Sequence, residues 1–422
     1  MPDRLLLQNG AAPDAFAPDE AAVADEKPAT FDAALAFDDP GAATIVTSIL
    51  GRAIELGASD LHFICKNDTL LVRARIDGAL HQLDHLPPAL AKGFIRRLKV
   101  LAHVDIAEQR KPQDGRFALR SKTDERHYDA RLATFPAIAG EGAVVRLLER
   151  SKVAPTLTHI GLTNAMQMGL ERIVSLPHGT LVVTGPTGSG KSTTLFAALS
   201  DIARPDVNVI TVEDPVEYEL PGTYQLQVNV AAGMTFANVL RSVLRGDPDV
   251  IVVGEIRDTE TALLAASAAI TGHLVLTTLH TNDAVGALTR LVDMGVEPYR
   301  VSAALTAVLS QRLVRRLCEH CRQPYEPSAD HVTAIGAPAG RTINAFRAVG
   351  CDQCSAGYRG RVGVFELLVL TAELRELIAR GAPRAELEPA ARRAGAEPIW
   401  VDGLVKAEAG TTSLEELKRV LG

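Results

Sequence analysis

The sequence lacks long apolar runs, and none of its apolar stretches approaches the roughly 20 residues that a bilayer-spanning helix requires. Its first residues, MPDRLLLQNGAAPDAF, also lack a continuous apolar segment after a basic start, which argues against a secretory signal peptide. These two absences predict a cytoplasmic protein whose contacts with a membrane are peripheral.

An excess of positive charge is missing as well, and only 4% of the residues are aromatic. Residues 1–40 hold nine acids and two bases, which accounts for the whole net charge of −7 and leaves the remainder neutral. A motor that tracks nucleic acid presents a broad basic surface interleaved with aromatic side chains. The composition therefore predicts no nucleic-acid partner, and a helicase-like motor is the weaker alternative.

Residues 1–38 are rich in alanine, proline and acidic residues, a composition that predicts a disordered tail. Residues 39–150 predict a small α+β domain. Apolar positions recur at helical spacing over residues 41–58, and a second helix is expected over residues 88–104. A hairpin is predicted within SDLHFICKNDTLLVRARIDGALHQL, because KND and DG interrupt its alternating runs.

Short, almost purely apolar strands alternate with helices from residue 162 onward, as is typical of a parallel sheet buried on both faces. These strands are predicted at 180–185, 207–214, 249–255 and 273–280. The pattern predicts an α/β fold with a mostly parallel sheet in residues 151–312. A segment that contains four cysteines, residues 313–368, and a helical C-terminal segment, residues 369–422, are expected to follow.

The stretch GPTGSGKST fits the phosphate-binding pattern G-x-x-x-x-G-K-[ST] and lies between an apolar strand and a helix, the context that this motif requires. Its glycines let the backbone wrap around phosphates, and the N–H groups of the loop and of the next helix supply positive potential. We expect Lys191 to reach the β- and γ-phosphates of ATP, and the hydroxyl of Ser192 to bind Mg²⁺. The predicted nucleotide-binding residues are Gly185, Pro186, Thr187, Gly188, Ser189, Gly190, Lys191, Ser192 and Thr193.

Three further predicted strands end on polar residues, namely Glu213 with Asp214, then Glu255, then His280. In an open parallel sheet, ligands bind outside the carboxyl ends of the strands. Each of these residues alone could be a solvated strand end, but together they predict one site beside Lys191. Glu255 is the candidate general base that orients the attacking water, and His280 is placed to sense the γ-phosphate.

Phosphoryl transfer also needs positive charge to compensate the phosphates. The candidates are Arg241 and Arg245 in VLRSVLRGDPD and Arg257 in GEIRD, and the sequence alone does not choose among them. A nucleotide-gated scaffold without turnover is the alternative from a different functional class. The placement of Glu255 beside the phosphate-binding loop argues against that alternative.

Four of the five cysteines form two C-x-x-C pairs, Cys318 with Cys321 and Cys351 with Cys354, separated by 29 residues. In a cytosolic chain such pairs indicate a metal site rather than disulfides. The spacing predicts a structural Cys₄ zinc site, with four reduced core thiols as the alternative. Cys65 stands alone and is expected to be a small buried apolar residue.

The motifs GPTGSGKST, VEDPVEYELPG, LRGDPDVIVVGEIRDTETA, TGHLVLTTLHTNDA, QRLVRRLCEHC and GCDQCSAGYRGRVGVFELL closely resemble the secretion ATPases of type II secretion and type IV pilus assembly (GspE/PilB-like). Upstream, ASDLHF, VRARIDGAL, KPQDGRFAL and DARLATFP are similar to the same family, so the likeness covers roughly residues 38–420. The resemblance implies a PAS-like domain over residues 39–150 and a RecA-like ATPase domain over residues 151–312. It also implies a hexameric, Mg-ATP-driven motor at the cytoplasmic face of the bacterial inner membrane.

The same resemblance implies roles for individual residues. The residues of the family's Asp box correspond to Glu213, Asp214 and Glu217. The acid of its Walker B motif corresponds to Glu255, and the histidines of its His box correspond to His273 and His280. Arginines of the domain before the motor reach the nucleotide in this family, and by position they correspond to Arg131 and Arg146. The tetracysteine segment binds zinc in assembly members and is missing from pilus-retraction ATPases, which argues against the retraction branch.

The stretches EDPVEYELPG and GALTRLVDMGVEPY look closer to the secretion members than to the pilus members. The predicted function is therefore to power pseudopilus assembly and protein export in type II secretion, through inner-membrane platform proteins. A type IV pilus assembly or DNA-uptake ATPase, with identical chemistry, is the alternative. Two departures stand out: Gly246 replaces the usual glutamine, and only the acidic tail precedes residue 40, so recruitment through the family's further N-terminal domain is not expected.

Overall fold

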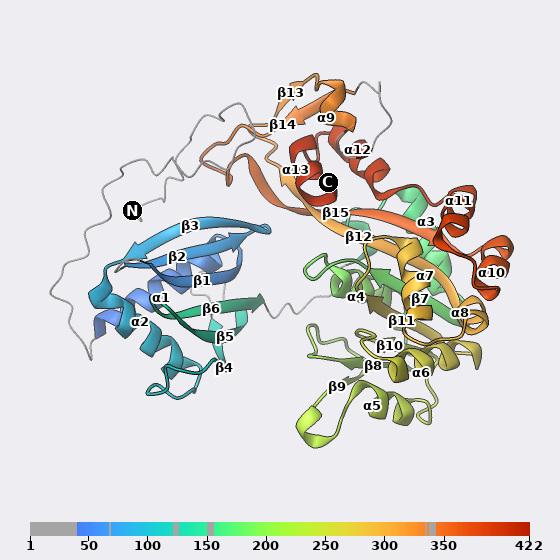
Figure 1. Ribbon diagram of the computed structural model, residues 1–422, viewed down its shortest axis with the longest axis horizontal. Coiled ribbons are helices and arrows are strands. Elements are labelled where there is room, and N and C mark those ends of the chain that lie inside the picture. The colour runs from blue at the N-terminus through green and yellow to red at the C-terminus, as the bar shows by residue number, and fades with distance from the viewer. Residues whose placement is uncertain (1–39, 67–68, 121–125, 150–155, 334–335, 337–342) are drawn as a thin grey trace. The chain divides into compact units, whose positions relative to one another are not determined.

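Two compact units make up the computed structural model (Figure 1). We call residues 40–149 the N-terminal unit and residues 156–422 the C-terminal unit. The described residues are 40–66, 69–120, 126–149, 156–333, 336 and 343–422. The predicted tail, residues 1–38, lies outside them. Within these ranges, no helix has the length and apolar character needed to cross a membrane.

A six-stranded antiparallel sheet and two helices form the N-terminal unit, with the strand order β3-β2-β1-β6-β5-β4 (Figure 1). The strands are β1 Ala58–Lys66, β2 Thr69–Ile76, β3 Ala79–Leu86, β4 Gln113–Arg120, β5 His127–Ala137 and β6 Gly140–Glu149. Helices α1 (Pro40–Glu55) and α2 (Pro88–Leu101) pack on one face of the sheet. Strand β2 shows why: Val72 and Ala74 are buried in the core with the helices, while Arg73 alternates to the other face.

A seven-stranded sheet forms the middle of the C-terminal unit, with the strand order β15-β12-β7-β11-β10-β8-β9. Neighbouring strands are parallel, except that β15 pairs antiparallel with β12 at one edge. The strands are β7 Gly179–Thr184, β8 Val209–Glu213, β9 Tyr224–Gln227, β10 Val250–Val253, β11 Leu274–Leu279, β12 Leu305–Leu317 and β15 Tyr358–Val369. Every residue of β7, β8, β10 and β11 is buried, which explains their unbroken apolar sequences and confirms the predicted α/β fold.

Helices cover both faces of this sheet (Figure 1). Helices α3 (Asn164–Val174) and α4 (Lys191–Ile202) share one apolar core with it. The helices that share the opposite core are α5 Phe236–Val243, α6 Thr259–Ile270, α7 Ala284–Asp293, α8 Pro298–Ala304, α10 Ala372–Ala379 and α11 Arg384–Arg393. The side chains of Asp258 and Asp283 cap the N-termini of α6 and α7, so both helices start directly after the loops that follow β10 and β11.

Strands β12 and β15 extend past the parallel sheet and carry a separate small core. Val314, Val362 and Val364 are buried there. The surrounding elements are β13 Gln323–Tyr325, α9 Ala329–Thr333, β14 Ala345–Arg347, α12 Ile399–Glu408 and α13 Leu414–Leu421. The cysteine-bearing segment and the last two helices therefore share one apolar core.

Candidate active site

The predicted phosphate-binding loop joins β7 to α4 at the carboxyl edge of the parallel sheet. Gly190 directly precedes α4 with a φ of 85°, a left-handed conformation that favours glycine. An added Cβ at Gly190 would lie 2.9 Å from Gln311 Nε2, and one at Gly185 would lie 2.4 Å from the Gln311 carbonyl oxygen. The loop is thus packed closely against β12, and the first turn of α4 presents the positive end of its dipole to the loop.

Lys191 is the first residue of α4, and its side chain folds back over the loop. Its Nζ donates hydrogen bonds to the carbonyl oxygens of Gly185 (2.9 Å) and Pro186 (3.1 Å) and lies 3.5 Å from His280 Nδ1. Burial lowers the pKa of Lys191, although the nearby Glu255 carboxylate opposes this shift. A partly dehydrated ammonium in this position interacts more strongly with an anion than one in bulk water does.

His280 lies between this lysine and the predicted general base. Its Nε2 is 3.4 Å from Glu255 Oε2, while its Nδ1 faces Lys191. The other oxygen of Glu255 is ion-paired with Arg257, whose guanidinium lies 3.8 Å from Asp214. These side chains come from the segments that follow β8, β10 and β11, so the structure brings the predicted strand-end residues together.

Glu213, the last residue of β8, is buried. Its Oε1 accepts hydrogen bonds from the Thr211 hydroxyl (2.6 Å) and from the Gln225 amide (3.0 Å). Burial raises the pKa of Glu213, and these two hydrogen bonds oppose the shift. A cavity of about 130 Å³ is lined, among others, by Lys191, Ser192, Glu213, Glu255 and His280. Its carboxylate and hydroxyl oxygens are the ligand types that Mg²⁺ prefers.

Some candidate residues lie elsewhere in the C-terminal unit. His273 precedes β11 at the opposite end of that strand from His280, where its ring nitrogen contacts a backbone carbonyl of α6. Arg241 is ion-paired with a glutamate of α6, and Arg245 donates a hydrogen bond to the Arg241 carbonyl at 2.9 Å. Among the three candidate arginines, it is Arg257 that pairs with the predicted general base.

Two further contacts near the site involve residues that the sequence analysis did not name as site residues. Gln311, buried on β12, accepts a hydrogen bond from Thr194 Oγ1 at 2.7 Å and so holds α4 against the sheet. The hydroxyls of Thr184 and Thr281 lie 2.7 Å apart, which ties the strand before the phosphate-binding loop to the residue after His280. In the sequence, Gln311 is the first residue of the motif QRLVRRLCEHC, and this is the signal that points to it.

The N-terminal unit holds the two remaining predicted residues, Arg131 on β5 and Arg146 on β6, directly opposite each other. On the sheet face away from the helices, the row continues with Arg116 on β4, Asp60 on β1 and Arg75 on β2, and we call these five residues the arginine row. Arg146 Nε donates to Asp60 Oδ1 at 2.9 Å. Burial favours a higher pKa for Asp60, but the hydrogen bonds from Arg146 and Ser59, together with the charges of Arg146 and Arg75, outweigh it and the pKa is lowered. Four guanidinium groups and one carboxylate give this face a positive stripe.

The four predicted metal ligands form one cluster. The Sγ atoms of Cys318 and Cys351 are 3.8 Å apart, those of Cys321 and Cys354 are 3.7 Å apart, and those of Cys351 and Cys354 are 3.6 Å apart. A tetrahedral site with Zn–S bonds of about 2.3 Å places its sulfur atoms about 3.8 Å from one another. The cluster therefore fits a Cys₄ metal ion, whereas Cys65 lies apart on β1 of the N-terminal unit.

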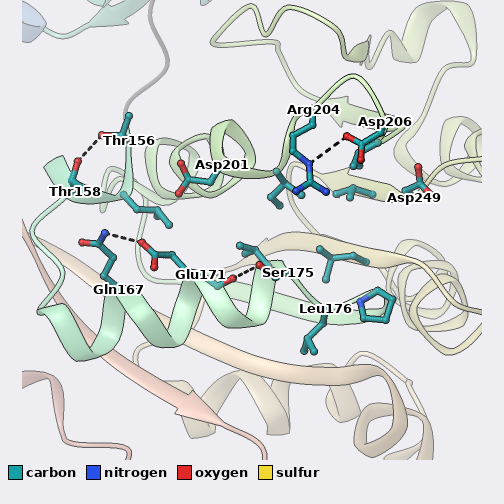
Figure 2. Close-up of a pocket in the computed structure, with 17 residues that line it drawn as sticks. Thr156, Thr158, Gln167, Glu171, Ser175, Leu176, Asp201, Arg204, Asp206 and Asp249 are labelled. Atoms are coloured by element: carbon teal, nitrogen blue, oxygen red, sulfur yellow. Dashed lines mark hydrogen bonds and ion pairs between the residues drawn. The ribbon is translucent and has the colours of Figure 1, made fainter.

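A larger cavity, of about 720 Å³, lies at the opposite edge of the same sheet (Figure 2). The ends of α3 and α4 and the starts of β10 and β11 contribute to its walls. Glu171, Asp201 and Asp249 give it an acidic lining, and its basic residue Arg204 is ion-paired with Asp206 at 3.4 Å. Negative charge repels phosphates, so this cavity is not the candidate site.

Comparisons with known proteins agree with this geometry. Residues 37–419 match the family described as Type II/IV secretion system protein. Type II secretion system protein E of Aeromonas hydrophila is 46% identical over 400 residues, which cover 94% of this chain and 79% of that protein. Type IV pilus assembly ATPase PilB of Thermus thermophilus is 45% identical over 91% of this chain, which spans 43% of the length of that relative. The crystal structure of the pilus retraction motor PilT with bound ADP has a TM-score of 0.56 and 26% identity, covering 88% of this chain and 95% of that one.

Proposed function

Because the chain belongs to the type II/IV secretion system protein family and is an ATPase of that family, we propose that it is the Mg-ATP-driven motor of a type II secretion system. In this role it powers pseudopilus assembly and protein export. The observation that carries the proposal is the meeting of Lys191, His280 and Glu255 beside a glycine-rich loop at the carboxyl edge of a parallel sheet. Such an arrangement can hold a triphosphate and direct a water molecule at it.

The phosphate-binding loop and Lys191 are assigned to the β- and γ-phosphates of ATP. Ser192 would hold Mg²⁺ through its hydroxyl, with the carboxylates of Glu213 and Glu255 lining the same cavity. When bound, the ion neutralises charge on the phosphates. The oxygen-rich lining of the cavity supports this assignment.

Glu255 is assigned as the general base. Its two oxygens have different partners, Arg257 on Oε1 and His280 on Oε2, so the carboxylate is fixed in orientation. Phosphoryl transfer depends more on positioning and charge compensation than on covalent help, which suits a carboxylate held in this way. His280 also faces Lys191, so it is placed to respond to the γ-phosphate.

The other parts of the chain receive supporting roles in this proposal. The PAS-like domain, residues 39–150, supplies Arg131 and Arg146 to the nucleotide of the RecA-like domain, residues 151–312. The positive charge of the arginine row supports that role, because a triphosphate is strongly anionic. The tetracysteine segment, residues 313–368, binds a structural zinc ion.

We further propose that the motor is a homohexamer at the cytoplasmic face of the inner membrane, recruited by platform proteins of the secretion system. The resemblance of the motifs to secretion ATPases supports this arrangement. A type IV pilus assembly or DNA-uptake ATPase is the second candidate, favoured by the 45% identity to the pilus assembly ATPase PilB. The two systems are distinguished by identifying the membrane protein that co-purifies with this chain from the cell envelope. The same experiment on a chain without residues 1–40 tests whether the tail is the tether.

Two substitutions test the ATPase site. Lys191→Ala is expected to abolish turnover, because the loop loses the ammonium that faces the phosphates. Glu255→Gln is expected to keep ATP binding and to lower phosphate release by a factor of about 10³. Glu260→Gln is the matched control, since this exposed carboxylate is paired with Arg241 on neighbouring helices. Wild-type turnover in Glu255→Gln would show that another group is the base.

A further inference from the structure

Two side chains outside the recognised motifs hold Glu213 in place. The buried carboxylate accepts hydrogen bonds on one oxygen, Oε1, from the Thr211 hydroxyl at 2.6 Å and from the Gln225 amide at 3.0 Å. The same carboxylate lines the cavity that it shares with Lys191 and Ser192. Burial disfavours the charged form of a carboxylate, and donors of this kind oppose that effect and fix the orientation of the carboxylate.

Both polar atoms of the Gln225 side-chain amide have hydrogen-bond partners. Its Nε2 donates to Glu213 Oε1 and to the Tyr218 carbonyl at 2.8 Å, and its Oε1 accepts the backbone N–H of Leu220 at 2.8 Å. The backbone N–H of Leu220 needs an acceptor, and the carbonyl of Tyr218 needs a donor. These two contacts therefore determine which end of the amide is oxygen and which is nitrogen. Gln225 therefore anchors the loop between β8 and β9 and presents an N–H group to Glu213.

Gln227, two residues further along β9, serves as an internal comparison. Its Oε1 accepts the backbone N–H of Val216 at 3.3 Å, so this side chain also contacts the loop between β8 and β9. The contact is with the loop backbone and not with the Glu213 carboxylate. Comparison of the two glutamines therefore distinguishes an effect of anchoring the loop from an effect of orienting the Glu213 carboxylate.

We propose that Gln225 is a positioning residue for ATP hydrolysis, which acts by orienting the Glu213 carboxylate at the cavity of Lys191 and Ser192. The inference rests on the proposed ATPase function and adds a residue to its site. Without the amide, Glu213 keeps the Thr211 hydroxyl but can turn within the cavity. The chemical step then slows, while the phosphate-binding loop continues to bind nucleotide.

A double-mutant cycle on the full chain tests this role. Gln225→Met keeps the length of the side chain and removes its hydrogen bonds, and it is expected to lower kcat about tenfold while changing KM for ATP less than about twofold. In a Glu213→Gln background, the same substitution is expected to change kcat less than about twofold, because the carboxylate that it orients is gone. Gln227→Met is expected to leave kcat unchanged in both backgrounds.

Thr211→Val removes the other donor with little change of shape, and it provides a second route if Gln225→Met folds poorly. Its effect on kcat is also expected to disappear in the Glu213→Gln background. The role of Gln225 is overturned if Gln225→Met keeps the wild-type kcat. It is also overturned if Gln225→Met lowers kcat by the same factor in the Glu213→Gln background as in the wild type. Turnover by the wild-type chain in the same series reports separately on the proposed ATPase function.

Discussion

The imidazole of His280 lies between Lys191, at the end of the phosphate-binding loop, and Glu255, the proposed general base. One ring nitrogen lies 3.5 Å from Lys191 and the other lies 3.4 Å from Glu255. We expect His280→Ala to lower kcat about 10- to 100-fold, because Glu255 would lose the partner of one oxygen and the response to the γ-phosphate. Steady-state ATP hydrolysis, together with ADP affinity, measures this effect, and ADP affinity is expected to stay within about threefold of wild type.

His273 is the matched control for that substitution. It belongs to the same sequence motif, yet it directly precedes β11 and contacts the Ala268 carbonyl at 2.9 Å. His273→Ala is therefore expected to leave the chemical step unchanged. Equal losses of kcat in the two variants would contradict the separation of the two histidines and would point to a shared structural role.

The residues at strand ends could be anticipated from the sequence, while those that support them could not. Parallel strands carry their carboxyl ends to one edge, so a polar residue directly after each apolar run predicts a common site for Glu255 and His280. Gln225 reaches Glu213 only because the chain between them folds back and β9 pairs with β8. No local sequence pattern predicts that β9 pairs with β8, so the sequence gives no reason to choose Gln225 over Gln227.

At the scale of elements, four central strands were predictable, whereas β12 and the edge strand β15 were not. Unbroken apolar runs identify β7, β8, β10 and β11 because these strands are buried on both faces. Strand β12 mixes apolar residues with Gln311 and Arg312, and β15 pairs with it antiparallel, so neither has the signature of a central parallel strand. Their extension past the sheet carries the apolar residues that pack with α12 and α13, and Cys318 directly follows the end of β12.

The cysteine cluster joins two loops of this small core, so its metal should matter for stability. Besides the four sulfur atoms, the backbone N–H groups of Gly350 and Cys351 each donate to a cysteine sulfur at 3.3 Å, as outer partners of metal ligands do. Elemental analysis of the purified chain is expected to find one zinc ion per chain. Cys321→Ser is expected to lose most of the zinc and to lower the Tm, whereas Cys65→Ser is expected to keep both. Full zinc occupancy in Cys321→Ser would exclude this cluster as the binding site.

At the scale of the whole molecule, charge is distributed unevenly. The acids in excess lie in residues 1–40, and the remainder of the chain is neutral. Within that neutral remainder, the arginine row gathers four guanidinium groups on one sheet face of the N-terminal unit. A local positive stripe on an otherwise neutral part of the chain suits recognition of a compact anion rather than a long polyanion. The ATP that we propose for the C-terminal unit is such an anion.

Substitution of the arginine row tests whether the two units cooperate in hydrolysis. Arg146→Ala is expected to lower kcat about 100-fold, because the γ-phosphate would lose a charge that compensates the transition state. ADP affinity is expected to change less than about threefold, since the β-phosphate is assigned in our proposal to the phosphate-binding loop of the C-terminal unit. Arg126→Ala is the matched control, because this exposed arginine of the same unit pairs with Glu149 at 3.1 Å. If Arg146→Ala hydrolyses ATP at the rate of the control, the arginine row does not take part in the reaction. The pairing of Arg146 with Asp60 would then have a purely structural role.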